Sequence, residues 1–250
     1  MLTNGLHSCL VRVFFLPVEL RTLITKFMLC KLTNGDIHTA ATYYNLEETK
    51  LRFGLIEWWD TSEVTRMEWI FSNCVDFNSD ISKWEVSSVT CMHCMFYNAR
   101  SFNQDLDTWN VSSVQDISGM FQGARSFNGS ITKWNVVNVT SMKAMFYEAK
   151  SFNQPLENWD VSNVENMDYM FDHAYEFNQP IGKWNISKVT DMALMFFCAR
   201  SFNQSIHAWP FRPERSICGM LAGAMAYNQE LTGEWKSASE RLFHTKFVIK

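Results

Sequence analysis

Hydrophobic and aromatic positions recur along the chain at a period of 25 residues. Tryptophan marks the period most clearly, at Trp59, Trp84, Trp109, Trp134, Trp159, Trp184 and Trp209. A second aromatic residue follows 18 positions after each tryptophan, and an asparagine comes directly behind it. So long a register is typical of a repeat array, in which each unit buries its apolar residues against the next.

Each unit is predicted to begin with a short strand. In the unit of residues 156–180, Leu156, Trp159 and Val161 have the spacing L-x-x-L-x-L, which is the strand signature of a leucine-rich repeat. Polar residues alternate with the last two of them, as they do along a half-buried strand. We therefore expect a parallel sheet along the array, with the tryptophans turned toward the core.

The second part of each unit is predicted to be a short helix. Between Val164 and Ala174 the apolar residues fall at steps of three and four, which makes one apolar stripe. Ser162 and Glu165 have the spacing of a capping box at the start of such a helix. The predicted fold class is therefore an α/β repeat, a leucine-rich-repeat-like solenoid with short parallel strands, short helices and helical caps.

Four regions follow from where the repeat begins and ends. Before it, the apolar pattern predicts short helices, the second from Glu47 to Phe53. After it, Lys236 to Phe247 has the pattern of one closing amphipathic helix, with Leu242, Phe243 and Phe247 turned inward. We expect an N-terminal helical segment at 1–35, a helical N-cap at 36–55, about seven repeats at 56–235 and a C-terminal cap at 236–250.

The recurring asparagines are predicted to form a buried structural ladder. Their side-chain amides can bond the backbone of their own turn and of the adjacent coil, where no strand or helix satisfies the polar groups. The ladder residues are Asn78, Asn103, Asn128, Asn153, Asn178, Asn203 and Asn228.

Two columns of polar residues are expected on the outward face of the predicted strands. One interpretation is that lysines and acids neutralise each other across the sheet. The other is a polar face that binds a protein or glycan partner. The candidate partner-binding residues are Lys83, Glu85, Asn110, Lys133, Asn135, Asn158, Asp160, Lys183 and Asn185.

Composition and charge narrow the classes of function. The chain of 250 residues has 22 Lys+Arg against 26 Asp+Glu, a net charge of −4, which argues against a nucleic-acid partner. No apolar stretch approaches the roughly 20 residues of a membrane span. The 7 cysteines are odd in number and irregularly spaced, and we find no clear signal peptide, so an intracellular setting is slightly favoured although the compartment is unknown.

Catalytic and metal-binding chemistry is not indicated by any motif. Cys91 and Cys94 form a C-x-x-C, but no second ligand pair follows at zinc spacing, which favours a structural origin. The 6 histidines never share a repeat column. We therefore predict a non-enzymatic chain with no cofactor and no metal.

The sequence of the repeat unit resembles that of a known family. Residues Trp134 to Gln154, WNVVNVTSMKAMFYEAKSFNQ, are similar to the unit of BspA-like leucine-rich-repeat surface proteins, including the 25-residue repeat of mycoplasma lipoproteins, and depart from it at Val137, where serine is expected. The resemblance implies a solenoid used for protein interaction or adhesion, without catalysis.

A second, shorter resemblance concerns the N-terminal segment. Leu16, Pro17, Glu19, Leu20 and Ile24 are similar to the opening of an F-box, L-P-x-E-L-x-x-x-I. This implies the alternative of an intracellular adaptor whose solenoid selects substrates for ubiquitination. A simple amphipathic helix that covers the first coil explains the same residues.

Overall fold

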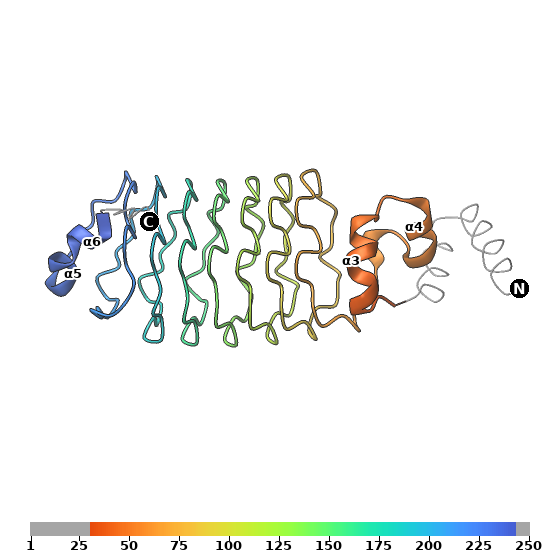
Figure 1. Ribbon diagram of the computed structural model, residues 1–250, viewed down its shortest axis with the longest axis horizontal. Helices are drawn as coiled ribbons and strands as arrows, with labels where there is room; N and C mark the ends of the chain where they lie inside the picture. The colour runs from red at the N-terminus through yellow and green to blue at the C-terminus, as the bar shows by residue number, and fades with distance from the viewer. Residues whose placement is uncertain (1–30, 244–250) are drawn as a thin grey trace, which may run out of the picture.

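The computed structural model describes residues 31–243 as a stack of irregular coils with helices at both ends (Figure 1). The coils follow one another along the long axis, so that residues 25 apart in sequence are neighbours in space. The elements are α3 (Asn34–Thr42), α4 (Glu47–Phe53) and the 3-10 helix η1 (Ile56–Trp58) before the coils, and α5 (Gly233–Ser237) and α6 (Ser239–Phe243) after them. The F-box-like residues 16–24 lie outside the described part of the chain.

The predicted α/β fold class is wrong. Between η1 and α5 the structure contains no α-helix and no strand, and consecutive coils are joined only by isolated parallel bridges. These bridges lie within the segment predicted as helical, and none lies at the predicted strand. They pair Arg66 with Cys91, Cys91 with Asp116, Asp116 with Ser141, Ser141 with Asn166, Asn166 with Asp191 and Asp191 with Ser216.

Hydrogen bonding between coils explains why the apolar stripe does not form a helix. An α-helix needs each N–H to bond four residues back. Here the N–H groups of Tyr169 and Phe171 instead donate to the next coil, to the carbonyls of Ala193 at 2.9 Å and Met195 at 2.8 Å. The N–H groups between them bond three residues back. This alternation places two residues of each coil, four apart, at positive φ, such as Tyr169 at 58° and His173 at 57°, which no α-helix contains.

Local turns explain why the predicted strand does not form. The N–H of Trp159 donates to the carbonyl of Leu156 at 3.1 Å, and the N–H of Val164 donates to Val161 at 2.9 Å. Asp160 accepts the N–H of Ser162 at 3.0 Å, so Ser162 belongs to a turn and caps no helix. The alternation of apolar and polar residues correctly predicts which side chains are buried, but two consecutive turns produce it and not a strand.

The core consists of stacked aromatic rings in parallel files. Within each coil but the last, two phenylalanines stack closely, as Phe121 and Phe127 do with ring centroids 3.8 Å apart. Between coils the same rings stack again, with 5.8 Å between Phe121 and Phe146. All of these rings are fully buried. Because each ring covers its neighbour's face, no single coil can form this core without the others.

The tryptophans form a second interior file, which confirms their predicted inward position. None of the tryptophans of this file is more than 4% exposed; they are Trp59, Trp84, Trp109, Trp134, Trp159, Trp184 and Trp209. The rings of Trp134 and Trp159 stack 6.2 Å apart and 6° from parallel. Each indole N–H in the interior coils also donates to a backbone carbonyl of the preceding coil, as Trp134 does to Leu106 at 2.8 Å. The tryptophan column therefore both packs the core and ties adjacent coils together.

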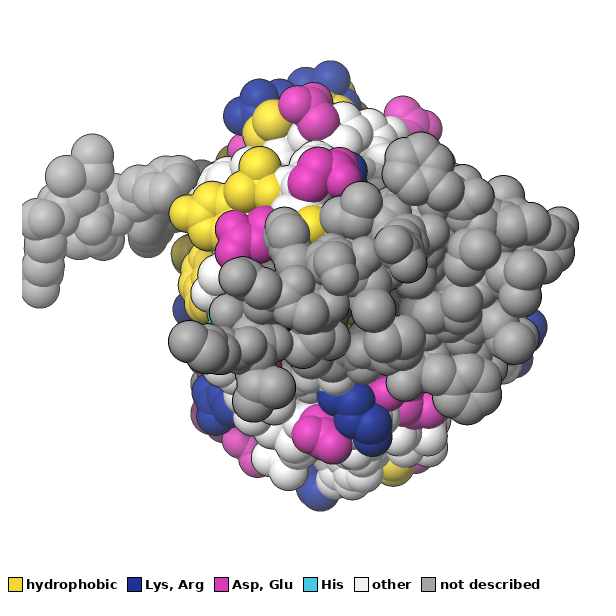
Figure 2. All heavy atoms as spheres, turned by 90° about the vertical axis from the view of Figure 1, so that its right-hand side faces the viewer, with side chains coloured by type: hydrophobic (Ala, Val, Ile, Leu, Met, Phe, Trp, Pro, Cys, Tyr) yellow, Lys and Arg dark blue, Asp and Glu magenta, His cyan; other side chains and the backbone are white. Residues whose placement is uncertain are grey.

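The N-terminal helices close the first coil. α4 spans the range that the sequence predicts, and the face of α3 formed by Ile37, Ala40 and Ala41 is buried. The side-chain oxygen of Asn34 accepts the N–H of Thr65 at 2.9 Å. In the later coils the equivalent N–H donates to a backbone carbonyl of the preceding coil, so Asn34 replaces that carbonyl at the start of the array. Seen from this end, hydrophobic side chains lie at the surface next to acidic ones (Figure 2).

At the other end the closing helix differs from its prediction. Of the single helix predicted from Lys236 to Phe247, the structure describes the part up to Phe243, where two short helices stand, the first beginning at Gly233; Phe247 lies outside the described residues. Leu242 is buried as predicted, but Phe243 is 41% exposed. The last coil donates backbone N–H groups to α6, from Gly219 to the carbonyl of Arg241 at 2.7 Å and from Leu221 to the carbonyl of Leu242 at 2.9 Å, which holds α6 against the coil.

Replacing Gly129 with alanine should destabilise the array by about 1–3 kcal/mol. A Cβ at this position would lie 2.1 Å from the carbonyl oxygen of Gln104, a backbone atom that cannot move aside. Gly35→Ala in α3 is the matched control, since its Cβ would meet nothing closer than 3.7 Å. Urea unfolding should give a lower midpoint for the first variant and not for the second. A shared midpoint would contradict the close approach of these coils.

Candidate functional site

The nine predicted partner-binding residues are all exposed, but one column is engaged in its own turns. The side-chain oxygens of Glu85, Asn110, Asn135, Asp160 and Asn185 each accept the N–H two residues ahead, at 2.9–3.2 Å. The hydroxyl and amide of Ser162 lower the pKa of Asp160 below its usual value. This column therefore shapes the corners of the coils.

The lysine column makes separate contacts. Among residues 31–243, no ion pair joins a lysine of one column to an acid of the other. Lys83 instead lies over the ring of Trp58, with Nζ 3.7 Å from the centroid. Lys133 lies 4.0 Å from Asp107 of the preceding coil, while Lys183 and Asn158 are exposed without a side-chain contact of this kind.

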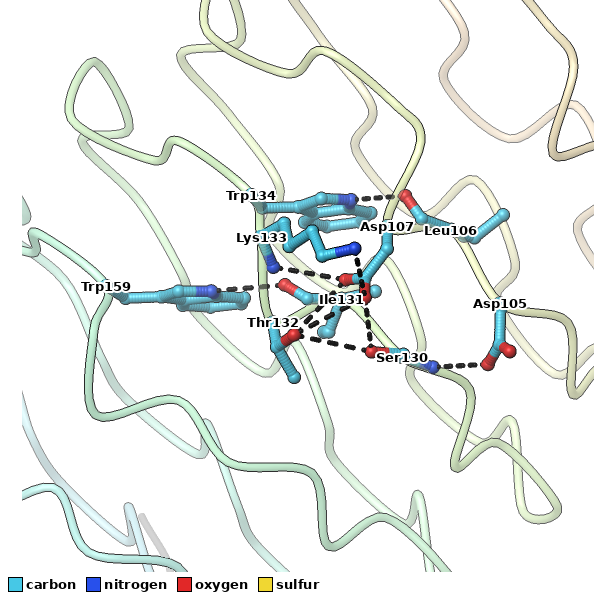
Figure 3. Close-up of polar contacts among 9 residues, drawn as sticks. All are labelled: Asp105, Leu106, Asp107, Ser130, Ile131, Thr132, Lys133, Trp134 and Trp159. Atoms are coloured by element: carbon cyan, nitrogen blue, oxygen red, sulfur yellow. Dashed lines mark hydrogen bonds and ion pairs between the residues drawn. The ribbon is translucent and has the colours of Figure 1, made fainter.

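Asp107 holds two consecutive coils together beside Lys133 (Figure 3). Its carboxylate accepts the hydroxyl of Ser130 at 2.7 Å and the backbone N–H of Lys133 at 3.0 Å. Burial by itself would raise the pKa of Asp107, but these hydrogen bonds outweigh it and the pKa lies below its usual value. The environment of Lys133 is thus explained by coil stacking.

The ladder asparagines join consecutive coils on the outside of the array. From Asn78 to Asn203, each side-chain oxygen accepts the backbone N–H of the next ladder asparagine at 2.7–3.0 Å. The expectation that they are buried is wrong, since four are exposed and Asn153, Asn178 and Asn203 are half-buried. Their place at an outer corner leaves the amides at the surface, while the preceding aromatic residue is buried.

A second surface, which the sequence reasoning missed, gathers aromatic and cationic side chains from three coils. We call it the aromatic–cation cluster; it consists of Tyr147, Lys150, Tyr169, His173, Tyr175, Phe197 and Arg200. The ring of His173 lies 5.4 Å from Phe197 and 5.8 Å from Tyr175. Tyr175 is also contacted by two cations, with the guanidinium carbon of Arg200 4.2 Å and Nζ of Lys150 5.0 Å from its centroid.

A buried carboxylate orients the centre of this cluster. Asp172 is 4% exposed and bonds Nδ1 of His173. Burial raises the pKa of Asp172 well above its usual value, and the contact with His173 opposes that rise. The histidine ring is therefore fixed in the middle of the cluster by a group beneath it.

The sequence does contain a signal for this cluster, namely differences in residue type between equivalent positions of successive coils. The stacking positions keep the same residue type in every coil but the last, which has Leu221 and Tyr227, whereas surface columns change throughout. In the column of Tyr175 the end coils carry Val75 and Met225 and the coils between them carry the cations Arg100, Arg125, Lys150 and Arg200, so that Tyr175 interrupts a run of cations. Comparing the units column by column marks such interruptions without any structure.

The C-x-x-C thiols have no reactive character. Burial raises the pKa of Cys91 to about 11 and of Cys94 to about 12, so neither forms a thiolate near neutral pH. In the part of the chain that the structure describes, no group of three or more His, Cys, Asp or Glu side chains is placed to hold a metal ion. No helix of that part is long and apolar enough to cross a membrane.

Comparisons with known proteins identify a family. No curated protein matches the chain. A crystal structure of a leucine rich cell surface protein from Faecalibacterium prausnitzii A2-165 is similar over 66% of this chain and 42% of that chain, at 13% identity and a TM-score of 0.42, so this chain spans less than half of that protein's length. The family model described as "Mycoplasma protein of unknown function, DUF285" matches residues 41–142 and 128–235, which supports the resemblance to mycoplasma repeats. Because the two matched segments cover most of the sequence, the chain belongs to the DUF285 family.

Proposed function

We propose that the chain is a non-enzymatic repeat module that binds another protein through the aromatic–cation cluster. The observation that carries the proposal is Tyr175, a half-buried ring in contact with Lys150 and Arg200. Tyrosine and arginine are enriched among the residues that dominate binding energy at protein interfaces. After the coils have stacked, the ring of Tyr175 is only half-buried, so a partner could cover its remaining apolar area.

Rigidity of the cluster also supports binding. His173 is bonded to Asp172 from below, and the cations restrict the ring of Tyr175. Side chains that are already held in place lose less conformational entropy when a partner covers them. Adhesion is the narrower form of this proposal, in which the partner is displayed on a cell surface. The nine predicted polar residues stay a second proposed contact strip, separate from the cluster.

Arg200→Ser should weaken partner binding at least tenfold, because the guanidinium contributes both charge and flat apolar area to the cluster. Partners are first captured by the native chain from extracts of the cells that make it, and their dissociation constants are then measured by biolayer interferometry. Lys133→Ser tests the polar strip in the same assay, and Lys236→Ser in α5 is the control.

If Arg200→Ser bound the partner with the affinity of the native chain and Lys133→Ser bound it more weakly, the interface would lie on the polar strip instead. Equal affinity in all three variants would reject both surfaces. A partner whose binding is abolished by glycosidase treatment would show that the chain recognises a glycan and not protein. For the adhesion form, binding of the labelled native chain to intact cells should fall with Arg200→Ser in the same proportion.

A further inference from the structure

A hollow of about 650 Å³ lies between α3 and the first coils, away from the aromatic–cation cluster. Its lining includes Asn34 and His38 from α3, and Arg66, Trp69, His93 and Asp116 from three consecutive coils. A hollow of this size falls within the range of roughly 300–1,000 Å³ that small-molecule sites occupy. We infer that it is a binding site for a neutral saccharide, a function beyond the proposed protein binding.

An exposed indole provides the apolar part of the site. Trp69 is 47% exposed, in contrast to the buried tryptophans of the core. Its ring makes edge-to-face contacts with His93 at 5.1 Å and with Tyr97 at 5.7 Å between centroids. The ring is thus held in one orientation while much of its surface stays open to the hollow. A flat, fixed aromatic surface is what the C–H face of a sugar ring packs against.

Folding of the array does not account for this tryptophan. Trp69 has a φ of 63°, a left-handed conformation that a bulky side chain rarely adopts. In the same column the other coils have Cys94, Gly119, Ala144, Tyr169, Leu194 and Gly219, all with positive φ. The coils therefore carry residues of very different size at this column, and no packing in the core requires an indole at Trp69.

The polar groups of the hollow select the class of ligand. Arg66 pairs with Glu68, and Asp116 adds one further carboxylate, so both signs of charge are present. A phosphate would face two carboxylates, whereas an organic cation would face the exposed guanidinium of Arg66. Nδ1 of His93 is buried without a hydrogen-bond partner among the described residues. Hydroxyl groups both donate and accept hydrogen bonds, so a neutral polyol suits this mixed lining.

The test is a titration of the full chain with neutral trisaccharides, namely maltotriose, cellotriose, mannotriose and chitotriose, followed by saturation-transfer NMR. We expect at least one of them to bind the native chain and its signal to fall at least tenfold in Trp69→Gly. Glycine stands at this column in two other coils, so the variant should melt no lower than the native chain. Trp58→Ala removes the other exposed indole, which is 52% exposed and contacts Lys83, and should leave binding unchanged.

Trp69→Phe separates loss of the platform from loss of folding, because it keeps a smaller ring and should retain part of the affinity. The inference is overturned if no trisaccharide binds the native chain, if binding survives Trp69→Gly, or if choline or inorganic phosphate displaces the sugar. None of these results bears on the protein-binding proposal, whose variants lie in other coils. Conversely, loss of a protein partner in Arg200→Ser should leave saccharide binding intact.

Discussion

Replacing Trp134 with alanine should lower the free energy of unfolding by about 3–5 kcal/mol. The indole is buried, stacks on Trp109 and Trp159, and fills space between coils that alanine leaves empty. The variant also removes the N–H that Leu106 accepts at 2.8 Å, which leaves a buried carbonyl unpaired. Urea unfolding followed by circular dichroism measures the loss.

Lys133→Ala is the matched control in the adjacent position. Its side chain is 77% exposed and its contact with Asp107 is long, so its removal should change stability by less than about 0.5 kcal/mol. The free energy of unfolding of Trp134→Phe should lie between those of the two alanine variants, because phenylalanine keeps a ring but loses the hydrogen bond. Equal melting temperatures for the two alanine variants would contradict the interior position of the tryptophan file.

Arg215→Leu should lower the free energy of unfolding by about 2–4 kcal/mol. Each buried carbonyl that loses its hydrogen bond costs about 1–3 kcal/mol. Part of this cost is offset, because leucine no longer buries a charge. Arg215 is 1% exposed. Its guanidinium donates to the carbonyls of Val189 at 2.8 Å, Pro210 at 2.7 Å and Ile186 at 2.9 Å. These bonds close the last coil against the one before it.

The place of Arg215 in the register explains why an arginine is buried there. Earlier coils carry a buried valine one position before, as at Val189, but the last coil has the exposed Glu214 at that position. The turn closes one residue later, and the stem of Arg215 enters the interior in place of the valine.

Two variants test whether geometry or charge matters at this position. Arg215→Lys keeps the charge but cannot reach three carbonyls in one plane, so it should also be destabilised. Arg212→Leu changes an exposed arginine of the same turn and should be nearly neutral. If Arg212→Leu were as unstable as Arg215→Leu, the three hydrogen bonds would not account for the effect.

The candidate surfaces could be predicted only in part. The sequence placed the nine polar residues at the surface, because exposure follows from their position between buried residues. It did not reveal that Glu85 and Asp160 are occupied by their own turns, since that depends on backbone geometry. Nor did it bring Tyr147, Tyr175 and Phe197 together, because their contacts join different coils and depend on the stacking register.

By itself the sequence determined the period, the order of the coils and the apolar columns that each coil buries. Burial follows from hydrophobic spacing within a unit, so Trp159, Met167 and Phe171 could be assigned to the core without a structure. Only the tertiary structure decided the backbone conformation. The N–H groups of Tyr169 and Phe171 can bond either within their own segment, as a helix, or to an identical segment one coil away. The second choice exists only when neighbouring coils are already stacked, and a spacing pattern read from one unit carries no information about it.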